Sequence, residues 1–143
     1  MEKIHALVHK LNNPDAGILL LRLALGIVFI YHGWAKIQGA EGMIPFFESL
    51  GFNAFWFYVA SYTEFLGGIA LILGLFVRYA GILLTITMAV AVVTVHWDMG
   101  FSLQQGGYEY AFALMLASAA LVATGAGKYS FTKKVPMVCT DCN

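Results

Sequence analysis

The chain has 143 residues, of which 60% are hydrophobic and only 11% are charged, and its mean hydropathy is +0.77. Soluble domains are about 45–50% apolar and about 25% charged, so this composition excludes an ordinary soluble enzyme and indicates an integral membrane protein. Eight basic residues balance eight acidic residues. From this composition we expect the protein to lie in the lipid bilayer and to bind no nucleic acid.

Four continuously apolar runs are each close to the about 20 residues that cross a bilayer. They cover residues 16–36, 56–77, 79–97 and 108–127. None alternates between apolar and polar residues, so they predict membrane helices rather than barrel strands. We therefore expect an all-α antiparallel bundle of four transmembrane helices within residues 1–131, followed by a flexible tail at 132–143.

The segment between the first two runs, residues 37–55, is long and apolar. Pro45 suits the first turn of a helix and Gly51 suits a C-terminal cap. This pattern predicts a short helix over residues 43–50 that lies in the membrane interface. An apolar loop that packs on the bundle without forming a helix fits the same residues. The next connection, at Arg78, is so short that the second and third runs must form an antiparallel hairpin.

The basic residues predict the orientation of the bundle. Six of the eight lie at the N-terminus, at the Arg78 turn or at the C-terminus, which share one side of a four-span protein. The opposite side carries only Lys36, and Trp34, Trp56 and Trp97 fall at that end of their runs. Lys and Arg mark the cytoplasmic side, and tryptophans gather at membrane interfaces. We expect a multi-pass protein of the plasma (inner) membrane with both termini cytoplasmic.

Ionisable side chains inside the apolar runs are the leading candidates for a functional site. A charge near the middle of a bilayer costs roughly 2.5–3.5 kcal/mol on insertion scales, so it usually faces a partner, a cavity or a substrate. The runs contain Arg22, Glu64, His96 and Glu109, with His32 and Lys36 near the end of the first. At about 1.5 Å of rise per residue, all except Arg22 fall in the outer half of the bilayer. The sequence therefore predicts an outer polar pocket around His32, Glu64 and His96.

Two of these residues have the chemistry of a proton relay. Histidine titrates near neutral pH, so a couple of Glu64 and His32 would exchange a proton there. The residues predicted to bind a ligand are Arg22, Phe29, Trp34, Lys36, Tyr62, His96, Tyr108 and Glu109. Each ionisable residue also has a structural interpretation. Glu64 would be kept protonated in apolar surroundings, or bonded to Tyr62 or His32. Arg22 would extend toward the cytoplasm or pair with Glu64, and Lys36 would anchor a helix end.

Three further features have competing interpretations. His96 and Asp98 are either two ligands of a metal site or solvent-exposed residues at the edge of a loop. No metal is predicted, because the outer cluster has no pair of ligand residues at a suitable spacing. Glu109 closes the pocket or is stabilised by the dipole of a helix N-terminus. Cys139 and Cys142 form a C-x-x-C motif near the end of the chain, either in a dispensable tail or in a thiol redox or metal-transfer role.

Taken together, these segments resemble the DoxX family of small four-helix membrane proteins. The first run contains Arg22-Leu23-x-x-Gly26-x-x-Phe29-x-x-His32-Gly33-x-x-Lys36. The second contains Glu64-x-x-Gly67-Gly68-x-x-Leu71-x-x-Gly74, followed by Arg78. Later come Gly106-Gly107-Tyr108-Glu109-Tyr110-Ala111 and Gly125-x-Gly127-Lys128-Tyr129-Ser130. The resemblance covers about residues 15–131, and it implies a redox-associated membrane protein, linked to quinone, or a protein of cargo export or receptor assembly.

Three functions compete on these grounds. The first is a quinone-interacting subunit of a membrane redox system, in which His32 and Lys36 donate to a quinone carbonyl and Glu64 relays the proton. Phe29, Trp34 and Tyr62 would line the slot. No dinucleotide, haem-attachment or iron–sulfur motif is present in the sequence, so electrons would come from a partner subunit or from substrate. The second is a non-enzymatic assembly or scaffold subunit, and the third is transport of a small solute or proton, which a homo-oligomer would favour.

Overall fold

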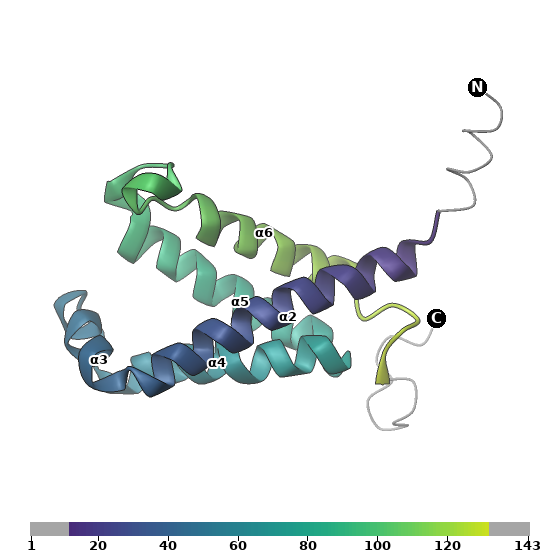
Figure 1. Cartoon of the computed structure of the whole chain (residues 1–143), viewed down its shortest axis with the longest axis horizontal. Helices are drawn as coiled ribbons and strands as arrows, with labels where there is room; N and C mark the ends of the chain where they lie inside the picture. The colour runs from purple at the N-terminus through teal and green to yellow at the C-terminus, as the bar shows by residue number, and fades with distance from the viewer. Residues whose placement is uncertain (1–11, 132–143) are drawn as a thin grey trace.

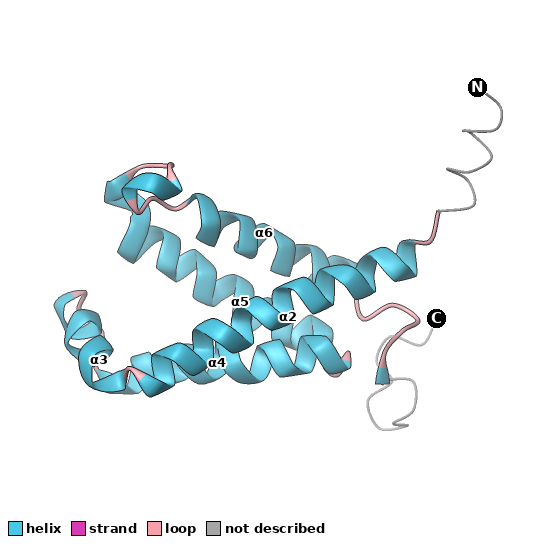
Figure 2. Ribbon diagram, viewed as in Figure 1, coloured by secondary structure: helices cyan, strands magenta, loops and turns pink. Residues whose placement is uncertain are grey.

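The computed structural model describes residues 12–131, and every regular element in that range is a helix (Figures 1 and 2). The α-helices are α2 (Pro14–Gln38), α3 (Ala40–Ser49), α4 (Ala54–Leu73), α5 (Val77–Ala91) and α6 (Glu109–Thr124). α5 continues through a π-helical turn at Val92–His96 and a 3₁₀ turn at Trp97–Met99, and a second 3₁₀ turn covers Leu103–Gln105. The predicted all-α fold is confirmed for this part of the chain.

Three of these helices are long and apolar enough to cross a membrane, namely Pro14–Gln38, Ala54–Leu73 and Val77–Met99. α6 is apolar too, but it has only 16 residues. At about 1.5 Å per residue it rises about 24 Å, which is less than the hydrocarbon thickness of about 30 Å. The prediction of four full-length spans is thus confirmed for three helices, and the fourth run forms a shorter one.

Caps and glycines set the helix ends. Asn13 and Asn53 precede α2 and α4, and each side chain accepts a hydrogen bond from a backbone N–H three residues ahead. The second run was expected to continue to residue 77, but α4 ends at Leu73 because Gly74 is left-handed, with φ 70°. α6 likewise ends at Thr124, before Gly125 (φ 73°), rather than at residue 127. Both corrections follow from glycine's freedom to adopt positive φ.

The predicted short helix exists, with different bounds. α3 begins at Ala40, directly after Gly39, and ends at Ser49. Pro45 therefore lies inside the helix and not in its first turn as expected. Gly51 acts as the expected C-terminal cap: its φ is 87°, and its N–H donates to the carbonyl of Glu48 at 3.0 Å.

The helices form two hairpins, α2 with α4 and α5 with α6, and Figure 1 shows them diverging toward the end that carries α3. We call this end, formed by α3 and residues 97–108, the loop end. The opposite end, formed by residues 12–14, 74–76 and 125–131, is the terminal end. There the Lys128 N–H donates to Asp15 Oδ1 at 2.9 Å, so both ends of the described chain meet. This agrees with the predicted sharing of one side by these segments.

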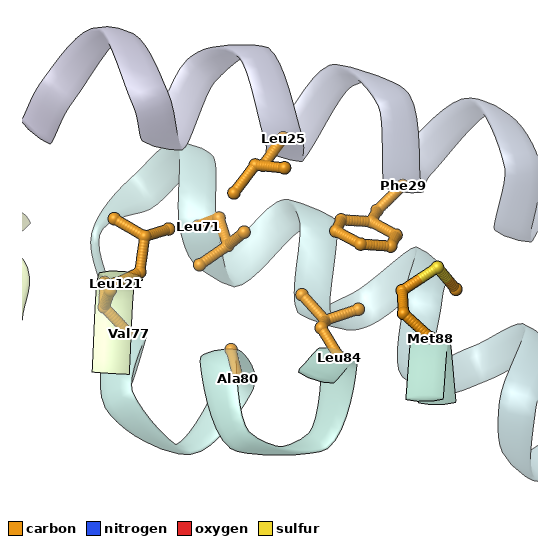
Figure 3. Close-up of a cluster of buried hydrophobic side chains, with 8 residues drawn as sticks. All are labelled: Leu25, Phe29, Leu71, Val77, Ala80, Leu84, Met88 and Leu121. Carbon is orange, nitrogen blue, oxygen red and sulfur yellow. The ribbon is translucent and has the colours of Figure 1, made fainter. Parts of the chain in front are cut away.

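An apolar core holds the hairpins together. Figure 3 shows Leu25 and Phe29 projecting from α2 toward Leu71 of α4 and toward Leu84 and Met88 of α5. The cluster is completed by Val77, Ala80 and Leu121. All these side chains are at least nine-tenths buried. The core therefore lies where the two hairpins cross, on the terminal side of their divergence.

α2 and α4 pack with their backbones almost in contact. A Cβ atom added to Gly68 would lie 2.8 Å from the carbonyl oxygen of Gly26, and one added to Gly33 would lie 2.5 Å from the backbone nitrogen of Phe65. Small residues allow such close approach of helices in lipid, where no hydrophobic effect drives association. Glycines therefore fix the α2–α4 seam.

Arg22 joins three segments at the terminal end. Its side chain is 1% exposed, and it donates to four backbone carbonyl oxygens. Two belong to the last turn of α4, Leu71 (2.8 Å) and Ile72 (3.1 Å), and two to the segment after α6, Ala126 and Tyr129 (both 2.7 Å). The final carbonyls of a helix lack intrahelical partners and carry partial negative charge. Arg22 satisfies them and attaches the chain's last described segment to α2.

We predict that Gly68→Ala destabilises the protein by about 1–3 kcal/mol, because the new methyl group would meet the backbone of α2. Gly17→Ala is the matched control: it lies in α2 with nothing within 4 Å of its Cβ position, so the better helix propensity of alanine should make it neutral or slightly stabilising. Thermal unfolding in mild detergent measures both. Equal effects would show that the seam does not depend on close approach.

We also predict that Arg22→Lys costs about 2–4 kcal/mol, because an ammonium group cannot reproduce the planar fork that reaches several carbonyls at once. Limited proteolysis should then cleave residues 125–131 more readily. The control is Lys128→Met, which removes only an exposed 3.3 Å ion pair to Asp15, worth less than about 1 kcal/mol. Similar losses in the two variants would contradict this role of Arg22.

Candidate functional site

The candidate site is an ion pair inside the α2–α4 hairpin. The Nζ of Lys36 lies 2.5 Å from Oε1 of Glu64. The Glu64 side chain is 1% exposed, whereas that of Lys36 is 23% exposed. A buried ion pair in a low-dielectric medium is held by strong mutual attraction against a large desolvation penalty. Keeping the Glu64 carboxylate buried therefore costs desolvation free energy, which the contact with Lys36 offsets.

The helical repeat of α4 explains why Glu64 points inward. The buried face of α4 consists of Phe57, Ser61, Glu64, Gly68 and Leu71, spaced three and four residues apart. The backbone of this face contacts α2 at Gly33, whose added Cβ would lie 2.8 Å from the carbonyl oxygen of Ser61. Lys36 follows Gly33 by three residues, in the last turn of α2. The close seam thus brings the ammonium and the carboxylate together.

One oxygen of Glu64 has no partner among the described residues. Oε2 of Glu64 is buried and accepts no hydrogen bond from any described residue. Buried carboxylate oxygens are nearly always bonded, and an exception calls for a ligand, a water or a proton. The partner of Glu64 among the described residues is Lys36, on Oε1, and not His32, Tyr62 or Arg22 as the sequence suggested. The arrangement can hold a proton, or accept a hydrogen bond, at Oε2.

His32 lies one helical turn before Lys36 on α2, and its side chain is exposed. Its ring lies between two tyrosines, with centroids 5.5 Å from Tyr31 in an edge contact and 6.1 Å from Tyr110 at the start of α6. Residues four apart on a helix lie on the same face. His32 and Lys36 are therefore neighbours, and His32 also bridges α2 to the second hairpin.

Aromatic side chains of the predicted slot separate into two groups. Phe29 is 1% exposed and belongs to the core. Trp34 is 50% exposed, with its ring 5.6 Å from Phe65, and Tyr62 is 47% exposed and stacks on Tyr58 at 6.3 Å. The ring contacts of these two residues are therefore with other aromatic side chains, Trp34 across the seam to α4 and Tyr62 along α4 itself.

The predicted residues of the second hairpin fasten the loop end. Nδ1 of His96 lies 2.7 Å from the carbonyl oxygen of Gly106. Oε2 of Glu109 accepts a hydrogen bond from the Leu103 N–H at 3.0 Å, and Tyr108 stacks on Trp97 with ring centroids 5.5 Å apart. We expected His96 and Glu64 to lie in one pocket, but the contact of His96 is with the Gly106 carbonyl. His96, Tyr108 and Glu109 order residues 97–108.

Arg22 lies at the terminal end. Its hydrogen bonds go to four backbone carbonyls there, and not to the Lys36–Glu64 pair. Among residues 12–131, no three His, Cys, Asp or Glu side chains are grouped as metal ligands. Cys139 and Cys142 lie outside the described residues.

Several residues that share the buried face of Glu64 or contact its neighbours were not predicted from the sequence. Ser61 and Phe57 are both fully buried on the face of Glu64. They precede it by three and seven residues, so helical spacing alone would have found them. Phe47 of α3 covers Phe57, with ring centroids 5.2 Å apart. The contact of Tyr110 with His32 carries no sequence signal, because it depends on how the two hairpins cross.

Known proteins resemble this chain along most of its length. The DoxX family profile matches residues 17–97, which include both members of the ion pair. A Bacillus subtilis (strain 168) protein named "Putative oxidoreductase CatD" is 40% identical over 111 residues, covering 78% of this chain and 81% of that protein. The Escherichia coli (strain K12) "Inner membrane protein YqjF" is 36% identical over 64 residues, covering 45% of this chain and 49% of that protein.

A Haemophilus influenzae protein is 28% identical over 128 residues, covering 85% of this chain and 84% of that protein. No solved structure matches the chain significantly. The profile match extends over more than half of the sequence, and the Bacillus subtilis relative is similar over most of both chains. These similarities, with three apolar helices long enough to cross a bilayer, show that the chain is a membrane protein of the DoxX family.

Proposed function

We propose that this protein is the quinone-binding subunit of a membrane redox system, with the quinone head at the Lys36–Glu64 pair. The single observation that carries the proposal is Oε2 of Glu64, a buried carboxylate oxygen without a partner among the described residues. Its neighbour Oε1 is held by Lys36, so the carboxylate is fixed in place. The name "Putative oxidoreductase CatD" of a relative supports a redox role.

The chemistry of the pair suits a ring with two carbonyl oxygens. A quinone takes up two electrons and two protons to become a quinol, and a redox partner subunit or a reduced substrate would supply the electrons. Lys36 has three donor protons, of which one is used on Glu64, so its ammonium group can donate to a carbonyl oxygen. Glu64 would hold or deliver a proton at Oε2. The adjacent His32 would connect this proton to the membrane surface.

The placement of the protein follows from the same proposal. We place it in the inner membrane, as the name "Inner membrane protein YqjF" of a second relative supports, with α6 as a fourth, shorter span. The terminal end would face the cytoplasm, because six of the eight basic residues belong to that side. The Lys36–Glu64 pair, nearer the loop end, would then lie in the outer half of the bilayer.

A scaffold function is the alternative, and the location of the pair favours it. Lys36 and Glu64 bridge α2 and α4 beside the glycine seam, where an ion pair would also fix the register of the helices. Buried polar groups are known to specify registry in some helical assemblies. In that case, removing Glu64 would lower stability or partner binding and would not change ligand content.

The first test is ligand extraction. We expect protein purified with its native lipids to carry quinone in stoichiometric amounts, identified by mass spectrometry. Glu64→Gln should lower this content about 10–100-fold, because a charge-assisted hydrogen bond is lost. The matched control is Glu48→Gln on the exposed surface of α3. Absence of quinone from the wild type and both variants, with Glu64→Gln less stable, would move the assignment to the scaffold.

A double variant separates packing from binding. We expect Lys36→Met to cost about 3–5 kcal/mol, because it leaves a buried carboxylate unpaired, and the added Glu64→Gln to recover most of that loss. Thermal unfolding measures both effects. The double variant should fold yet contain no quinone. A folded double variant that retains quinone would show that the pair is not the binding group.

A further inference from the structure

The seams between the helices differ in how tightly they are closed. α2 and α4 touch through backbone at Gly26, Gly33 and Gly68. α5 and α6 are nearly as close, since a Cβ on Gly81 would lie 3.1 Å from the carbonyl oxygen of Ser118. α2 and α6 meet over a short stretch only and diverge toward the loop end (Figure 1). Toward the loop end, the ring contact of His32 with Tyr110 joins them.

This contact belongs to a polar aromatic group on the outer surface of the bundle. Tyr31 is 69% exposed and Tyr110 is 39% exposed, and His32 between them is exposed as well. Ionisable side chains in transmembrane segments usually face a cavity or the bundle interior, so an imidazole on the outer surface marks a functional site by default. In a bilayer, the ring nitrogens and the two hydroxyl groups would need partners other than lipid tails.

The group lies one helical turn from the lysine of the Lys36–Glu64 pair. Lys36 follows His32 by one helical turn, and helix side chains lean toward the N-terminus of their helix. The Lys36 side chain therefore leans back toward His32 while its ammonium group holds Glu64. With 23% of its side chain exposed, Lys36 connects the exposed aromatic group to the buried carboxylate.

We propose that Tyr31, His32 and Tyr110 form a lateral docking site, between α2 and α6, where the head of a quinone arriving from the lipid phase is first bound. This inference rests on the proposed function. The ligand class is a ring that bears carbonyl oxygens and an apolar tail. The two hydroxyl groups and the imidazole donate to the oxygens, while the tail stays in the bilayer. Lys36 lies one helical turn beyond His32 on α2, so the head would reach it past the ring contact of His32 with Tyr110.

Photolabelling tests the docking site. The probe is an azido-quinone with a short isoprenoid tail, irradiated with the full-length protein in lipid nanodiscs and mapped by peptide mass spectrometry. We expect label on the peptides that contain Tyr31, His32 and Tyr110. The double variant His32→Phe/Tyr110→Phe keeps the rings and should reduce this label about tenfold, because it removes hydrogen-bond donors. The control Tyr108→Phe, in a ring stacked on Trp97, should leave it unchanged.

Glu64→Gln distinguishes failure of the docking site from failure of the function. We expect this variant to lose label near residue 64 and to keep label at Tyr31, His32 and Tyr110. Label near residue 64 alone in the wild type would overturn the docking site and leave the proposed function standing. Label spread evenly over exposed surfaces, including the Tyr62 side of α4, would also overturn it. No label anywhere would overturn both proposals.

Discussion

The structure depends on satisfying two charged groups inside a single pair of helices. α2 carries two cations, and both find partners across the seam with α4 or just beyond it. Arg22 does so through the final carbonyls of α4 and the segment after α6, and Lys36 does so through the carboxylate of Glu64. Because lipid offers no hydrogen bonds, each contact is obligatory once the charge is placed there. The glycines that bring the backbones together make both contacts reachable.

The two charged groups nevertheless differ in how completely they are hydrogen-bonded. Arg22 is fully engaged with carbonyl oxygens, so it acts as a fastener of the terminal end. Within residues 12–131, the Lys36–Glu64 pair leaves Oε2 of Glu64 without a partner, and its lysine is partly exposed. The pair bridges α2 and α4 near the loop end, where α2 and α6 diverge.

The loop end illustrates how similar chemistry serves a different purpose in the second hairpin. His96 and Glu109 bind backbone groups of residues 103–106, and Tyr108 stacks on Trp97. These contacts close the connection between α5 and α6 locally. Their side chains are thereby occupied, so they do not contribute to the pair on the first hairpin. Ionisable residues toward the same end of the bundle can thus belong to separate networks.

The sequence by itself determined the helices, the membrane class and the charged residues that need partners. Long apolar runs must form helices in lipid, and helical spacing placed Glu64 on one face with glycine. It also indicated the DoxX family, which the comparisons confirm. Only the tertiary structure decided which partner each charge takes. Depth along a helix is readable from residue counts, but the choice of Lys36 over His32 or Arg22 depends on the rotation of α2 against α4. That rotation is set by backbone contacts at Gly26, Gly33 and Gly68, which no single-helix pattern contains.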